Sequence, residues 1–131
     1  MSDKKVAVQL RSPLGRVRGM GSAKQGSHHW WMQRVSSMAL LPLMLWFVIS
    51  VASLAGHSHA ETIRWIGHPL NATLLLLTIA IGFQHTASGL QVVIEDYVED
   101  EMTRMALILV EKAACVLFGV LAALAVLRIA V

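Results

Sequence analysis

Three long apolar segments account for most of the 131-residue chain and constrain its fold more than any other feature. They run over about residues 34–55, 69–94 and 105–131. At a helical rise of about 1.5 Å per residue, each segment can cross a bilayer core roughly 30 Å thick. A soluble domain of this size could not cover so much apolar surface, since 56% of the residues are apolar and only 15% are charged. The pattern predicts an all-α integral membrane protein with three transmembrane helices.

Two regions follow from this pattern, a basic tail over residues 1–33 and a three-helix transmembrane domain over residues 34–131. The tail has several glycines and few apolar residues, so we expect it to be extended. The first apolar segment begins after more than thirty residues and lacks a convincing cleavage site, which favours a retained helix over a signal peptide. Short loops leave no room for a soluble catalytic domain. Any chemistry must therefore be shared with other chains.

The charge distribution predicts the orientation of the chain in the membrane. Seven of the eleven basic residues precede the first span or begin it, where Asp3 is the only acidic residue. The positive-inside rule places the N-terminus in the cytoplasm and, with three spans, the C-terminus outside. The tail is interpreted as a topology signal that contacts anionic lipid, and it lacks a recognition element for nucleic acid. The seven basic residues are Lys4, Lys5, Arg11, Arg16, Arg18, Lys24 and Arg34.

His85 is the most informative polar residue because it lies inside the second apolar segment. An ionisable side chain at membrane depth is costly unless it has a partner, so it indicates a cofactor, an ion path or a proton path. At 100° per residue, Gly82 and Gly89 lie on the same helix face as His85. These glycines permit close helix packing or leave room for a flat macrocycle, and both readings fit. A haem iron needs a neutral imidazole, which burial favours.

Asp96 and Tyr97 follow His85 by eleven and twelve residues, about 16 to 18 Å along a helix. This spacing places them near the cytoplasmic interface. A neutral tyrosine hydroxyl can donate to a carbonyl oxygen, and a neighbouring carboxylate can orient it or supply protons. A polar helix end with an interfacial tyrosine is the other interpretation.

The motif His85-x-x-x-Gly89 followed by Asp96-Tyr97 resembles the small membrane-anchor subunit of succinate dehydrogenase, respiratory complex II. In that family the motif histidine is an axial ligand of haem b. The resemblance therefore implies that His85 binds the haem iron, with Gly89 beside it, and that the second axial ligand comes from a partner subunit. The family's tyrosine hydrogen-bonds the ubiquinone carbonyl with support from the preceding aspartate, which implies these roles for Tyr97 and Asp96.

The segment His29-Trp30-x-x-x-Arg34-Val35 resembles the start of the first helix in the same family. There the arginine and histidine lie near the haem propionates, which implies this role for Arg34. His28 and His29 are adjacent, so either could be the family's histidine, and the tryptophan that follows His29 favours His29. The third helix matches the family only in being apolar.

The resemblance implies an anchor that pairs with a second cytochrome b subunit and tethers the flavoprotein and iron-sulfur subunits to the bacterial inner membrane or, less in keeping with the pattern, the mitochondrial inner membrane. Electrons from succinate would pass through FAD and iron-sulfur clusters on those subunits to ubiquinone, and the isolated chain would have no activity. Two alternatives stay open. One is the anchor of a quinol-oxidising fumarate reductase, and the other is a small transporter subunit, for which Glu111 would be a candidate midplane residue.

Overall fold

The structure, a computed structural model, describes residues 25–131, with the backbone alone for residues 25–27 and 29. Within this part of the chain every regular element is a helix. The predicted all-α fold is therefore confirmed. Residues 1–24 of the predicted extended tail lie outside the described residues, whereas residues 25–33 belong to the first long helix. In chain order the helices are α2 (Gln25–Leu54), α3 (His59–Gly67), α4 (Pro69–Tyr97) and α5 (Glu101–Ala130).

Helices α2, α4 and α5 are each long and apolar enough to cross a membrane. The candidate spans are Trp30–Leu54, Pro69–Tyr97 and Glu101–Ala130, which overlap the three predicted apolar segments. Each span extends three or four residues past the predicted segment at the end that carries the N-terminus of α2. Because a helix ends where its terminal backbone groups find other partners, it can continue beyond the point where the sequence turns polar.

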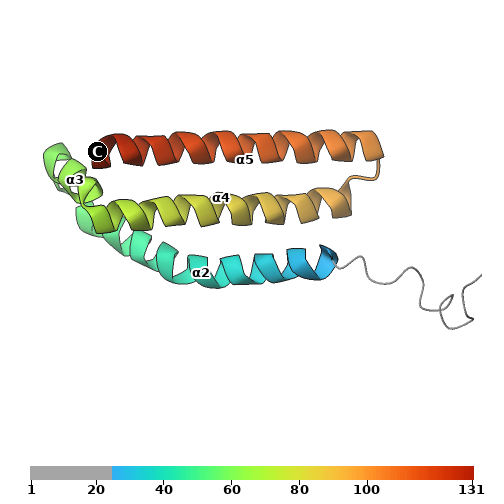
Figure 1. Ribbon diagram of the computed structural model, residues 1–131, viewed down its shortest axis with the longest axis horizontal. Helices are drawn as coiled ribbons and strands as arrows, with labels where there is room; N and C mark the ends of the chain where they lie inside the picture. Colours follow the sequence, from blue (N-terminus) through green and yellow to red (C-terminus); the bar gives the residue numbers. More distant parts are fainter. Residues whose placement is uncertain (1–24) are drawn as a thin grey trace, which may run out of the picture.

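The three long helices lie side by side in an antiparallel row, with α4 between α2 and α5 (Figure 1). Figure 1 also shows that the N-terminal end of α2, the C-terminal end of α4 and the N-terminal end of α5 lie at one end of the bundle. Helix α3 and the C-terminus lie at the opposite end. This arrangement brings the predicted first-helix motif close to the predicted second-helix motif.

The described part of the chain has very little apolar core of its own. Ala72 and Leu75 of α4 are its buried apolar residues, while most of the large apolar side chains on α2, α4 and α5 are exposed. Contiguous apolar surface on this scale is not compatible with water. It must be covered by lipid or by other protein, as expected for three helices arranged in a single layer.

Helix α3 lies between the first two predicted spans, where the sequence pattern predicted no helix. Its start is a capping box, in which the Ser58 hydroxyl accepts from the Glu61 N–H at 3.3 Å and the Glu61 carboxylate accepts from the Ser58 N–H at 2.7 Å. The Glu61 carboxylate also accepts from the Ser58 hydroxyl at 2.8 Å, and the hydrogen bonds from the Ser58 N–H and hydroxyl lower the pKa of Glu61. The helix is held against the bundle because Trp65 stacks on Trp46 of α2, with 5.8 Å between ring centroids.

The ends of α4 and α5 are also defined by local hydrogen bonds. The His68 ring precedes α4 and accepts from the Leu70 N–H at 3.3 Å, and Pro69 occupies the first helical position, which needs no donor. Asp100 caps α5, accepting from the Thr103 N–H at 2.8 Å. Hydrogen bonding to Thr103 lowers the pKa of the Asp100 carboxyl.

Candidate functional site

His85 lies on the side of α4 that faces α2, where its ring is partly buried. Its Nδ1 atom is 2.9 Å from the hydroxyl oxygen of Ser36, and its Nε2 atom is 3.5 Å from the side-chain nitrogen of Gln33. Ser36 and Gln33 are three residues apart on α2, so their side chains lie on neighbouring positions of one helix face. The imidazole thus has polar partners from within the chain, which offset the cost of placing it in a membrane span.

The two glycines predicted to flank His85 also lie against α2. A Cβ atom added at Gly89 would lie 3.4 Å from the Gln33 side-chain nitrogen, and one added at Gly82 would lie 4.0 Å from the Leu40 side chain. Close helix packing is therefore one use of these glycines. The predicted place of Gly89 beside a haem stays a prediction.

Asp96 and Tyr97 form the last two residues of α4 and are both exposed. The Tyr97 side chain is 83% exposed, so a group from outside this chain can reach its ring and hydroxyl. The pair lies at the end of the bundle that also carries the N-terminus of α2 (Figure 1).

Arg34 lies within that end of α2 and is exposed. Its guanidinium carbon is 4.8 Å from the centroid of the Trp30 ring, a cation–π contact that orients the side chain. His28 is exposed, and the side chain of His29 lies outside the described residues. The structure therefore does not choose between His28 and His29, and both stay predictions.

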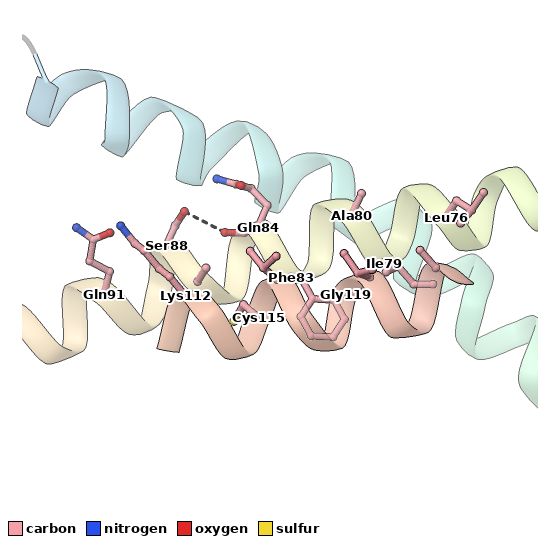
Figure 2. Close-up of a pocket in the computed structure, with 14 residues that line it drawn as sticks. Leu76, Ile79, Ala80, Phe83, Gln84, Ser88, Gln91, Lys112, Cys115 and Gly119 are labelled. Atoms are coloured by element: carbon pink, nitrogen blue, oxygen red, sulfur yellow. Dashed lines mark hydrogen bonds between the residues drawn. The ribbon is translucent and has the colours of Figure 1, made fainter. Parts of the chain in front are cut away.

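A cleft of about 630 Å³ lies between α4 and α5 and contains none of the predicted site residues (Figure 2). Most of its lining is apolar. Phe83 packs against Gly119 there, where an added Cβ atom would lie 3.4 Å from the Phe83 ring. Figure 2 shows Gln91 and Lys112 together at one end of the cleft. Apart from Ser88, its α4 residues lie about 100° or more from His85 around the helix axis, so most of the cleft belongs to a different face of α4 from the imidazole.

Glu111, the residue considered for a transporter path, is partly buried in α5. One of its carboxylate oxygens accepts from the Cys115 thiol at 3.5 Å, and the other is buried without a hydrogen-bond partner among the described residues. Within the described part of the chain, no three His, Cys, Asp or Glu side chains gather as ligands for a bare metal ion.

The sequence profile of the succinate dehydrogenase/fumarate reductase transmembrane subunit family matches residues 9–121. The chain belongs to this family. Similar proteins named succinate dehydrogenase hydrophobic membrane anchor subunit occur in Rickettsia conorii, 30% identical over 85% of this chain and 89% of the relative, and in Rickettsia bellii, 33% identical over 86% and 90%. The subunit of the same name in Paracoccus denitrificans is 32% identical over 74% and 75%. No solved structure gives a significant match.

The contacts of the two ring nitrogens of His85 indicate whether this residue is suited to bind a haem, the cofactor that the family resemblance implies. A haem iron is already held by the porphyrin and needs only axial ligands, so one imidazole from this chain suffices. The Ser36 contact occupies Nδ1, so a haem iron bound by His85 would be bound through Nε2. Among the described residues, the one hydrogen-bond neighbour of Nε2 is the distant Gln33 amide, whose oxygen is buried without a partner in that part of the chain. These donors fit a haem ligated through Nε2.

Ser36 and Gln33 are site residues that the sequence did not reveal. Their types are ordinary at the polar start of a membrane helix, and their spacing matches no ligand pattern. The only sequence signal is position, because both flank Arg34 in the motif that resembles the family's first helix. Which residues of α2 face His85 depends on how the two helices pack, and no residue pattern specifies that directly.

Proposed function

We propose that this chain is the haem- and quinone-binding anchor subunit of a succinate:ubiquinone oxidoreductase. The observation that carries the proposal is an imidazole inside a membrane span whose Nδ1 atom is hydrogen-bonded 2.9 Å from Ser36, in a chain of the succinate dehydrogenase anchor family. Such a ring is held in one orientation with one nitrogen left for a ligand. A haem b bound there would supply one-electron chemistry next to the quinone. The residues proposed to contact it are His85 at the iron, Gly89 at the ring face, and Arg34 with His28 or His29 at the propionates.

The quinone site is proposed at the end of α4. Tyr97 would donate its hydroxyl proton in a hydrogen bond to a ubiquinone carbonyl, which withdraws charge from the oxygen as electrons arrive. Asp96 precedes it and would orient the hydroxyl or relay protons that the reduced quinone takes up. The high exposure of Tyr97 supports this proposal, because a quinone and a neighbouring subunit both need access to the ring.

The proposed function would also require contacts with lipid and with three other subunits. The exposed apolar faces of α2, α4 and α5 would contact lipid and a second cytochrome b anchor subunit, which would supply the other axial ligand. The flavoprotein and iron-sulfur subunits, with FAD and the clusters, would dock at the end that carries Tyr97. Relatives in Rickettsia and Paracoccus support a bacterial inner membrane, with the basic N-terminus in the cytoplasm. The isolated chain would have no activity.

The family description also covers fumarate reductase subunits, whereas the relatives cited above are named for succinate dehydrogenase. Their names favour quinone reduction as the physiological direction. Family membership likewise favours an anchor over a transporter subunit.

The test is purification of the complete complex with all its subunits, followed by two measurements. The reduced-minus-oxidised optical spectrum should show a low-spin bis-histidine haem in a fixed ratio to flavin, and succinate should reduce ubiquinone. A fully assembled complex that contains flavin but no haem would refute the haem assignment. Assembly with succinate oxidation but no quinone reduction would refute the assignment of the quinone site.

A further inference from the structure

Ser36 is a buried polar residue in the contact between α2 and α4, and it is only 9% exposed. We propose that Ser36 is a positioning residue for the haem ligand, whose hydroxyl oxygen accepts the Nδ1–H of His85 and thereby presents Nε2 to the iron. The inference rests on the proposed function, since it concerns how a haem ligand is held.

The Ser36 oxygen can accept a hydrogen bond because its own proton is donated elsewhere. A serine hydroxyl has one proton to donate and two lone pairs to accept with. That proton is directed to the backbone carbonyl of Gln33 at 2.9 Å. The Ser36 oxygen is therefore free to accept, and the nearest ring atom is Nδ1 of His85 at 2.9 Å. Serine donating to the helix backbone and accepting from histidine satisfies both groups.

Binding of iron determines which nitrogen of the His85 ring carries the proton. A neutral imidazole that binds iron through one nitrogen must carry its proton on the other nitrogen. Binding through Nε2 therefore puts a proton on Nδ1, where the Ser36 oxygen already lies within hydrogen-bond distance. Binding through Nδ1 would instead require the buried serine side chain to be displaced.

The Gln33 side chain is held only weakly beside the Nε2 atom of His85. The Gln33 side-chain nitrogen lies 3.5 Å from Nε2, at the outer limit of a hydrogen bond, and it occupies space that the missing side chain of Gly89 leaves free. The Gln33 amide oxygen is buried without a partner among the described residues. A flexible side chain that is held weakly on one side and unsatisfied on the other can move from Nε2 at little cost.

The consequence for the iron follows from the donor strength of the ring. An acceptor at Nδ1–H gives the imidazole more negative character, which makes it a stronger ligand and fixes its tautomer and orientation. A stronger donor stabilises oxidised iron more than reduced iron. Removing the Ser36 acceptor should therefore raise the midpoint potential of the haem and weaken its binding.

The chain offers a matched control at the next position. Ser37 is also on α2, and its hydroxyl donates to the same Gln33 carbonyl at 2.8 Å, but it is exposed and has no hydrogen bond to His85. Ser37→Ala removes the same atom from the same helix without touching the ring. Ser36→Thr keeps the hydroxyl and is the conservative variant at the test position.

The experiment compares wild type, Ser36→Ala, Ser36→Thr and Ser37→Ala in the purified complete complex. The measurements are the midpoint potential by redox titration of the haem bands, the g-values of the oxidised haem by electron paramagnetic resonance, and haem transfer to an apo-globin acceptor. In Ser36→Ala the potential should rise, the g-values should shift, and haem affinity should fall roughly ten- to a hundredfold. Ser36→Thr and Ser37→Ala should match wild type.

Two results would overturn the inference while leaving the proposed function intact. One is a haem in Ser36→Ala with the potential, g-values and affinity of wild type. The other is an equal change in Ser36→Ala and Ser37→Ala, which would mean that α2 was perturbed without any special role for the His85 contact. A wild-type complex that contains no haem would refute the proposed function itself, and the inference with it.

Discussion

The Ser36 hydroxyl oxygen and the His85 Nδ1 atom lie 2.9 Å apart, joining α2 to the middle of α4. Burial strengthens such a contact, because a polar group left unpaired in a membrane protein is costly. The pair therefore specifies which face of α2 packs against α4. It also determines which side of the imidazole is available to a ligand.

We expect His85→Leu to remove or greatly loosen the haem while the chain still inserts into the membrane. The substitution deletes the proposed axial ligand but keeps a side chain that is compatible with a membrane span. The measurement is the haem-to-flavin ratio and the reduced spectrum of the purified complex. His57→Leu is a suitable control, because His57 is exposed in the loop between α2 and α3. A full complement of low-spin haem in His85→Leu would show that the ligand is another residue.

We expect Tyr97→Phe to slow ubiquinone reduction while sparing succinate oxidation by an artificial acceptor. The change removes one hydrogen bond to the quinone carbonyl but keeps the ring, so the barrier should rise by about 1–3 kcal/mol, roughly a ten- to hundredfold loss of rate. Steady-state assays with the two acceptors on the same preparation make the comparison. A general defect of assembly would lower both rates together. Ubiquinone reduction at the wild-type rate would leave Tyr97 as an interfacial anchor only.

The number and position of the membrane helices could be predicted from the sequence, because an apolar segment of twenty or more residues has few alternatives to a span. Helix α3 was missed, although Ser58 and Glu61 form the spacing of a capping box. A helix of 9 residues is marginal by itself, and this one depends on the stacking of Trp65 on Trp46 and on the hydrogen bond from Asn71 to the Trp65 carbonyl at 2.8 Å. A local sequence pattern does not specify such tertiary contacts.

Part of the candidate site could likewise be predicted from the sequence, and part could not. His85 could be identified from the sequence because an ionisable residue inside an apolar segment is rare and costly. Its partners Ser36 and Gln33 lie 49 and 52 residues away in sequence, and they meet it only through the rotation of α2 relative to α4. Tyr97 was singled out because its motif resembles that of a known family. Its side chain is 83% exposed and has no hydrogen bond among the described residues that would indicate a role.

We expect the N-terminus to lie in the cytoplasm and the C-terminus outside. The physical reason is the excess of basic residues before α2, which are retained on the cytoplasmic side during insertion. Fusing a reporter after Val131 measures the orientation, with alkaline phosphatase active only outside and a fluorescent protein that folds only inside. The same reporters fused after Val98, between α4 and α5, serve as the control, since that loop should lie in the cytoplasm. Cytoplasmic reporter activity after Val131 would contradict the predicted orientation.

We expect the start of α3 to become less stable as the pH falls, because of the Glu61 carboxylate. The pKa of Glu61 is lowered, chiefly by its hydrogen bond with the Ser58 backbone. A carboxyl whose pKa is lower in the folded state stabilises that state fully above its ordinary pKa, and the effect is lost as the pH falls through the folded value. The contribution should therefore be complete at neutral pH and absent at strongly acidic pH.

Hydrogen exchange of the α3 amides in lipid nanodiscs, corrected for the intrinsic pH dependence of exchange, can measure this contribution. At neutral pH, Glu61→Ala should make these amides exchange several-fold faster than wild type, because the half of the capping box that the carboxylate forms is lost. The difference should shrink to nothing below the folded pKa, where the wild-type carboxyl is protonated and no longer favours the box. Glu99→Ala, an exposed glutamate at the opposite end of the bundle, should leave α3 unchanged at every pH. A difference between Glu61→Ala and wild type that persists at acidic pH would mean that the side chain stabilises α3 by packing and not through its charge.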